Sequence, residues 1–152
     1  MYRERDADWK RWALLSGLFL FMSADEASAI HEILIRPLRT GLGLSGILYF
    51  SWVVPAIVLV GALAIFLAPF LVRLPRLHAV RFVGCGAVFL GGALGMELFS
   101  GYLASRYGME HPRYRIAALI EESMEIAGST LFCAALLAYL RDRFGAWTLR
   151  VA

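Results

Sequence analysis

The sequence predicts an all-α, polytopic membrane protein that folds as a four-transmembrane-helix bundle. Hydrophobic residues make up 60% of the 152-residue chain, and the mean hydropathy is +0.66. Soluble domains contain about 45–50% apolar residues, and a membrane-spanning helix needs about 20 of them in succession. Four stretches are long enough, at about 12–35, 47–72, 79–104 and 115–140. They leave room for a single transmembrane domain over 1–152.

The first predicted span, 12–35, differs from the others because only its first part is uniformly apolar. The run from Trp12 to Ala24 is thirteen residues long, which is shorter than the about 20 residues that a crossing helix needs. The segment therefore either crosses the membrane with its polar last third facing protein, or re-enters on the same side. We favour a crossing helix. Pro37 is expected to end it, because proline interrupts helical hydrogen bonding.

The remaining spans are more regular. The second, 47–72, contains no ionisable residue. The third, 79–104, is rich in glycine, and its Gly91-x-x-x-Gly95 motif allows another helix to approach closely. This glycine-rich helix is the predicted contact with a second copy of the chain or with a larger membrane complex. The fourth, 115–140, begins with a run of glutamates.

The distribution of basic residues predicts the topology. Ten lysines and arginines fall on the side that holds both termini and the second connection, and five fall on the other side. Because basic residues concentrate in cytoplasmic loops, both termini are predicted to be cytoplasmic in a multi-pass membrane protein. The net charge of +3 then reflects topology. The lipid bilayer is the expected partner, and nucleic acid is not.

Acidic residues are unusually frequent inside the predicted spans. Seven of the twelve lie there, in the first, third and fourth spans, and an up-and-down topology places all of them in the outer half of the membrane. An isolated charge at mid-membrane costs about 2.5–3.5 kcal/mol on insertion scales. These groups must therefore face the bundle interior and share protons, pair with arginines, or bind a cation. At 3.6 residues per turn, Asp25, Ser28, Ala29 and Glu32 would share one helix face.

A metal centre is the first hypothesis for this site. Carboxylates and histidines that project inward from several helices form the di-iron and di-manganese centres of ferritin-like bundles. Hard oxygen ligands with one imidazole suit iron, manganese or zinc, in a mononuclear or dinuclear site. The chain has no Glu-x-x-His motif, and its second span offers no ligand. The predicted core ligands are Glu32, Glu97, Glu122 and Glu125, with Asp25, His31 and Glu121 as ligands or supporting partners.

Two other hypotheses stay open. Clustered carboxylates can translocate protons or other cations, although the inner half of all four spans is apolar and shows no path through the membrane. Alternatively, the carboxylates form a structural polar layer of protonated acids and arginine–glutamate pairs in an accessory or scaffold subunit of a larger membrane complex. The arginines on the appropriate side are Arg36, Arg39, Arg113 and Arg115.

No motif identifies a reaction. The sequence has no serine–histidine–acid order, phosphate-binding loop or haem motif. It therefore leaves open whether the chain is an enzyme, and it assigns neither a catalytic residue nor an organic cofactor. Cys85 and Cys133 lack the spacing of a metal pair and lie inside spans, which favours packing roles.

Three motifs occur together in this chain. They are Asp25-Glu26 with Ile30-His31-Glu32, the segment Gly91-Gly92-Ala93-Leu94-Gly95-Met96-Glu97, and Glu121-Glu122-Ser123-Met124-Glu125-Ile126-Ala127-Gly128. The combination resembles a group of small uncharacterised bacterial inner-membrane proteins with Asp-Glu…Ile-His-Glu, Gly-Ala-x-Gly-x-Glu and Glu-Glu-x-x-Glu-Met-x-Gly helices. Ile126 stands where that pattern has methionine. The resemblance covers most of the chain and implies a four-helix bacterial membrane protein, but it implies no reaction.

Overall fold

The computed structural model describes residues 8–145, in which all regular structure is helical. The helices are α1 (Trp9–Ser28), α2 (Glu32–Leu42), α3 (Val53–Arg73), α4 (Arg76–Leu90), α5 (Glu97–Tyr107) and α6 (Pro112–Phe144). A 3-10 turn, η1 (Gly46–Leu48), precedes α3, and a π-helical segment, η2 (Gly91–Met96), joins α4 to α5. The all-α prediction is confirmed for this part of the chain.

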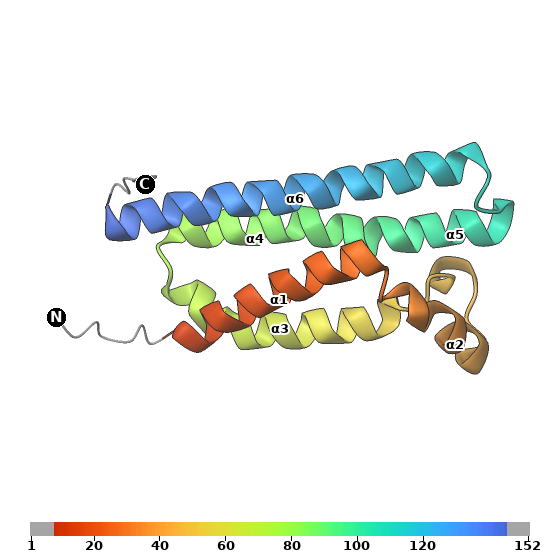
Figure 1. Cartoon of the computed structure of the whole chain (residues 1–152), viewed down its shortest axis with the longest axis horizontal. Helices are drawn as coiled ribbons and strands as arrows, with labels where there is room; N and C mark the ends of the chain where they lie inside the picture. Colours follow the sequence, from red (N-terminus) through yellow and green to blue (C-terminus); the bar gives the residue numbers. More distant parts are fainter. Residues whose placement is uncertain (1–7, 146–152) are drawn as a thin grey trace.

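The helices form two layers, which can be followed in Figure 1. α4, η2 and α5 make one continuous rod that runs beside α6, while α1 and α3 lie on the other side of the molecule. Three helices are long and apolar enough to cross a membrane, namely Val53–Arg73, the rod Arg76–Tyr107 and Pro112–Phe144. The bent pair α1–α2 makes a fourth if it counts as one span. The second, third and fourth predicted spans therefore correspond to α3, the rod and α6.

The first predicted span is not one straight helix. α1 ends at Ser28, α2 begins at Glu32, and the two helices meet at 83°. Ala29 has a left-handed backbone with φ of 48°, a conformation that ends helices. A carboxylate oxygen of Asp25 accepts a hydrogen bond from the backbone N–H of His31 at 2.8 Å, so the side chain replaces the lost helical partner. The predicted shared face of Asp25, Ser28, Ala29 and Glu32 consequently does not form.

Pro37 does not end a helix, contrary to the expectation from sequence. It lies inside α2, which continues to Leu42 and is closed by Gly43 with φ of 62°. A proline removes one intrahelical hydrogen bond, but α2 also receives a hydrogen bond from a residue outside the helix. The buried hydroxyl of Ser51 donates a hydrogen bond to the carbonyl oxygen of Ile35 at 2.7 Å. This contact ties α2 to the residues that precede α3.

The rod and α6 approach closely at glycines. A Cβ atom on Gly128 would lie 2.6 Å from the backbone nitrogen of Phe89, and one on Gly92 would lie 2.9 Å from a backbone oxygen of α6. Any larger residue would force the helices apart. At Gly95 no atom lies within 4 Å of the added Cβ, whereas at Gly91 a methionine of α6 lies at 2.9 Å. Within the chain, therefore, Gly92 and Gly128 lie against the backbone of the neighbouring helix, Gly91 contacts the end of a methionine side chain, and Gly95 has open space.

Aromatic side chains pack together at the end of the bundle where α1 begins and α3 and α6 end. The Trp12 ring stacks on Tyr139 with centroids 5.5 Å apart and meets Phe70 edge-on at 4.9 Å, which joins α1, α3 and α6. Just before α1, Asp8 pairs with Arg73. The hydrogen bond from the Arg73 guanidinium, assisted by its charge, holds the pKa of the Asp8 carboxyl below its usual range. The start of α1 is therefore fixed to the end of α3.

Candidate functional site

The break between α1 and α2 places Asp25 and His31 side by side. One carboxylate oxygen of Asp25 holds the backbone N–H of His31, and the other lies 2.7 Å from its ring nitrogen Nδ1. In the part of the chain that the structure describes, Nε2 of His31 takes part in no hydrogen bond. The imidazole packs against the indole of Trp52, with ring centroids 4.7 Å apart. The ring of His31 is therefore fixed in orientation while one nitrogen stays available.

Trp52 connects this pair to the rod. Its indole nitrogen Nε1 donates a hydrogen bond to the carboxylate oxygen Oε1 of Glu97 at 2.7 Å. Glu97 is only 8% exposed and follows directly after η2. A π-helical turn carries an extra residue, which shifts the direction of the side chains beyond it and often marks a functional site. η2 thus sets the direction in which the Glu97 carboxyl group points.

Ser100 links Glu97 to α6. Its hydroxyl oxygen lies 3.1 Å from Oε2 of Glu121 and 3.4 Å from Oε2 of Glu97. Ser100 is buried and Glu121 is partly buried. Two carboxyl groups from different helices therefore meet on a single hydroxyl.

Glu125 lies one helical turn beyond Glu121 on the same side of α6. A Cβ atom on Gly92 would lie 3.1 Å from the Cγ atom of Glu125. The Glu125 side chain therefore fits here because Gly92 has no side chain. Glu125 is within electrostatic range of Glu26, Glu97 and His31. Acidic side chains of α1, the rod and α6 are therefore within electrostatic range of one another.

We call this set the acidic network. It consists of Asp25, His31, Trp52, Glu97, Ser100, Glu121 and Glu125. Of the predicted ligands, Glu32 and Glu122 are exposed, and the described hydrogen bonds and ion pairs do not include them. Within residues 8–145, no group of three or more His, Cys, Asp or Glu side chains is arranged to hold a metal ion. The metal-ligand set stays a prediction from sequence.

Three of the four arginines expected to neutralise the carboxylates contact other groups. Arg39 lies over the ring of Tyr49 at 4.3 Å, and Arg115 pairs with Glu110 in the exposed loop at 2.6 Å. Arg113 lies over a tyrosine ring of α5. Among the described residues, no ion pair joins an arginine or lysine to the acidic network. The arginine–glutamate pairs of the polar-layer hypothesis are therefore not seen in residues 8–145.

Trp52 and Ser100 are the site residues that the sequence does not single out. Both have recognisable signals in retrospect. Trp52 is an indole N–H donor just before an apolar helix, and Ser100 lies three residues after Glu97, on the same helix face. A buried carboxylate needs donors, so a search for hydroxyl and indole groups at helical spacing from Glu97 would have found them.

Removing the indole N–H of Trp52 tests the link between the two layers. We expect Trp52→Phe to lower the free energy of unfolding by about 1–3 kcal/mol, since it leaves a buried acceptor on Glu97 unpaired. Thermal unfolding in detergent measures this change. In a Glu97→Ala background the same substitution should have little further effect. Additive losses would contradict the hydrogen bond between the two side chains.

The fold defines the class to which the chain belongs. In residues 8–145 it is all-helical, with three, or up to four, helices long and apolar enough to cross a membrane. Hydrogen bonds join Trp52 to Glu97 and Ser100 to Glu121 between these helices. Residues 2–140 match the family described as a domain of unknown function (DUF8692), and the chain belongs to this family. No curated protein and no solved structure matches the chain.

Proposed function

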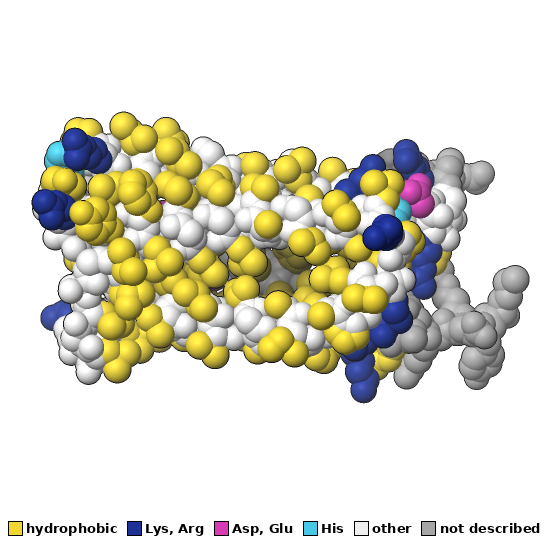
Figure 2. All heavy atoms as spheres, turned by 180° about the vertical axis from the view of Figure 1, so that it is seen from behind, with side chains coloured by type: hydrophobic (Ala, Val, Ile, Leu, Met, Phe, Trp, Pro, Cys, Tyr) yellow, Lys and Arg dark blue, Asp and Glu magenta, His cyan; other side chains and the backbone are white. Residues whose placement is uncertain are grey.

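We propose that the chain is a multi-span protein of the bacterial inner membrane, a four-helix bundle in which α1 and α2 together form one bent span. The length and apolar character of the helices support this. Figure 2 shows hydrophobic side chains over the middle of the molecule and lysines and arginines at its two ends. Such an arrangement suits an apolar bilayer core between two polar interfaces.

Reporter fusions test the proposed topology. A reporter that is active only in the periplasm should be active when fused after Gly108, in the connection between α5 and α6, and silent after Arg76, at the start of α4. The charge bias between the two sides is the physical reason. The reverse pattern would place the acidic network near the cytoplasmic face.

We infer that the acidic network binds a cation within the membrane, and that the cation it takes most readily is a proton. The observation that supports this inference is the excess of acidic over basic side chains in the network. Asp25, Glu97, Glu121 and Glu125 have His31 as their one basic partner among the described residues. Carboxylates in a low-dielectric site without cationic partners take up protons or cations.

The Ser100 hydroxyl favours a proton. A hydroxyl carries one hydrogen, and Ser100 has three acceptors for it: the backbone oxygen of Glu97 at 3.1 Å, Oε2 of Glu121 at 3.1 Å and Oε2 of Glu97 at 3.4 Å. A carboxyl group that does not receive this hydrogen makes a hydrogen bond with Ser100 only if it is protonated and donates to the Ser100 oxygen. Glu97 and Glu121 therefore suit a state in which the pair holds one proton.

Carbodiimide labelling tests for such a proton. Carbodiimides react with protonated carboxyl groups in apolar surroundings, and mass spectrometry locates the product. We expect labelling at Glu97 or Glu121 near neutral pH that falls as the pH rises. Glu110, which is exposed and paired with Arg115, is the control and should not react. Labelling of Glu110 alone would contradict the inference.

A metal ion is the second candidate, favoured by the geometry of His31. A histidine that binds a metal through one ring nitrogen often donates a hydrogen bond from the other nitrogen to a carboxylate. In this structure, Nδ1 of His31 lies 2.7 Å from a carboxylate oxygen of Asp25. Iron, manganese or zinc would then bind at Nε2 with carboxyl oxygens nearby. Elemental analysis of the purified protein beside a Glu97→Ala/Glu125→Ala variant tests it. A stoichiometric metal that the variant loses supports a metal site, and its absence from both proteins supports the proton.

A further inference from the structure

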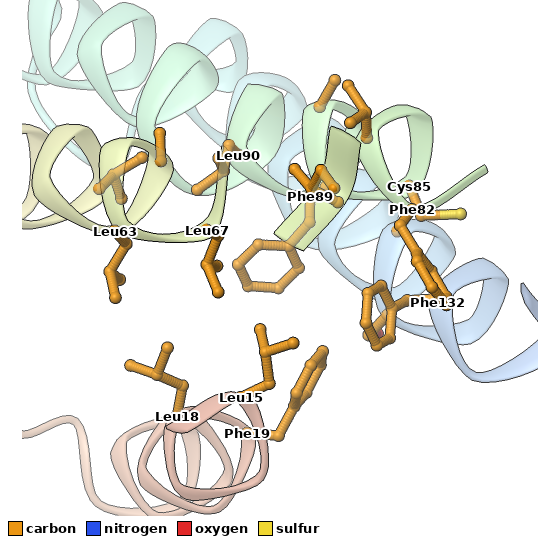
Figure 3. A pocket seen from close by; sticks show the side chains of 18 of the residues that line it. Leu15, Leu18, Phe19, Leu63, Leu67, Phe82, Cys85, Phe89, Leu90 and Phe132 are labelled. Carbon is orange, nitrogen blue, oxygen red and sulfur yellow. The ribbon is translucent and has the colours of Figure 1, made fainter. Parts of the chain in front are cut away.

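An apolar cavity of about 440 Å³ lies between the two helix layers. Figure 3 shows Leu15, Leu18 and Phe19 of α1 facing Leu63 and Leu67 of α3 across it, with side chains of α4 above. On the outside, Figure 2 shows a hollow between the layers near the middle of the molecule. The hydroxyl of Ser129 is the one oxygen-bearing side chain among the described residues that line the cavity.

The shape of the cavity limits what can fill it. Its α1 wall runs from Trp12 to Met22, which is about 15 Å at 1.5 Å per residue. Apolar side chains line the cavity along this length. A linear hydrocarbon chain can lie along such a slot and bury its methylene groups there.

One end of the cavity lies beside carboxyl groups. Met22 lines it, and Glu26 follows one turn later on α1. On α6, Gly128 and Ser129 line it one turn after Glu125, and the Ser129 hydroxyl donates to the backbone oxygen of Glu125 at 2.8 Å. Glu26 and Glu125 are within electrostatic range of each other. Like charges facing each other at the mouth of an apolar slot attract a cationic group.

We propose that this cavity binds a long-chain amphiphile with an ammonium head group. Its hydrocarbon chain fills the slot between α1, α3 and α4, and its ammonium group donates hydrogen bonds to Glu26 and Glu125. An ammonium offers three donors and no acceptor, whereas ionised carboxyls are acceptors only. The proposal rests on the acidic network as a cation site, to which Glu125 belongs; Glu26 of α1 adds a carboxyl from outside the network.

Photo-crosslinking in phosphatidylcholine nanodiscs tests whether the hydrocarbon chain of the amphiphile occupies the cavity. The probe is hexadecylamine with a mid-chain diazirine, and mass spectrometry maps its attachment. We expect it on residues of α1, α3 and α4 that line the cavity. Gly86 lines the cavity, and no atom lies within 4 Å of a Cβ placed on it, so Gly86→Leu should fill the slot and abolish this labelling. Gly84→Leu is the control, because Gly84 lies in the same helix, equally open but outside the cavity.

The head group is tested with hexadecanol and hexadecanoate probes that carry the same diazirine. A hydrogen bond between charged groups is stronger than one made by a neutral hydroxyl, so the amine should label the slot at least about tenfold more than the alcohol. Glu26→Gln/Glu125→Gln should remove this preference. Equal labelling by all three probes, or labelling that Gly86→Leu leaves unchanged, would overturn the proposal.

The same variants separate this proposal from the proposed function. Gly86→Leu leaves every carboxyl of the acidic network in place, so carbodiimide should still label Glu97 or Glu121 in it. If carbodiimide labelling persists while the amine shows no preference, the amphiphile site is wrong and the cation site stands. If carbodiimide labels neither glutamate and no metal is bound, the cation site itself is wrong.

Discussion

Replacing Gly128 by leucine should strongly destabilise the protein. A Cβ at this position would lie 2.6–2.7 Å from the backbone and Cβ atoms of Phe89, so α4 and α6 must separate. Overpacking a well-fitted interior typically costs about 1–3 kcal/mol and more when backbone must move. We expect a loss of about 3 kcal/mol or more, measured by thermal unfolding in detergent.

Gly84→Leu is the matched control for this change. It introduces the same side chain into the same helix pair, but at a site with no atom within 4 Å of the added Cβ. Removing a glycine from a helix is favourable by about 0.8–1 kcal/mol, so this variant should be at least as stable as the wild type. Equal destabilisation by the two substitutions would contradict the close contact of α4 with α6.

Replacing Glu97 by alanine should produce the largest loss of both stability and cation binding within the site. The change removes the acceptor of the Trp52 indole N–H and one of the two carboxyl partners of Ser100, and it opens a cavity. Each unpaired buried group costs about 1–3 kcal/mol. We expect a total loss of about 2–4 kcal/mol, together with loss of carbodiimide labelling at Glu121.

Two further variants test the role of the Glu97 carboxyl group. Glu110→Ala removes a carboxyl of the exposed loop and should change the stability by about 0.5 kcal/mol or less. Glu97→Gln keeps an oxygen for Trp52, so it should retain most of the stability while weakening cation binding. If Glu97→Ala and Glu110→Ala have equal effects, the carboxyls do not form one site.

The sequence predicts the helical class well because hydropathy and length are local properties. The spans 79–104 and 115–140 fall inside the observed rod and α6, with ends displaced by only a few residues. The level of the acidic groups also follows from sequence, since an up-and-down arrangement of helices places Glu97 and Glu121 at the same depth. The sequence therefore predicts the positions of the helices along the chain and their up-and-down order.

The sequence does not predict the details that orient the side chains. The bend at Ala29 depends on a left-handed residue and on the capture of a backbone N–H by Asp25, and alanine by itself gives no signal for either. The π-helical segment η2 changes which way Glu97 points, whereas periodicity arguments assume a regular α-helix. The exposure of Glu32 follows from the bend, because Glu32 begins a new helix and no longer continues the face of Asp25.

Infrared spectroscopy of the purified protein tests the cation-binding claim most directly. A protonated carboxyl group has a carbonyl stretching band that an ionised one lacks. At neutral pH the wild-type protein should show this band, with a shift on hydrogen–deuterium exchange, and Glu121→Gln or Glu97→Gln should remove it. A spectrum with no such band in the wild type, from a protein that also contains no metal, would contradict the acidic network as a cation site.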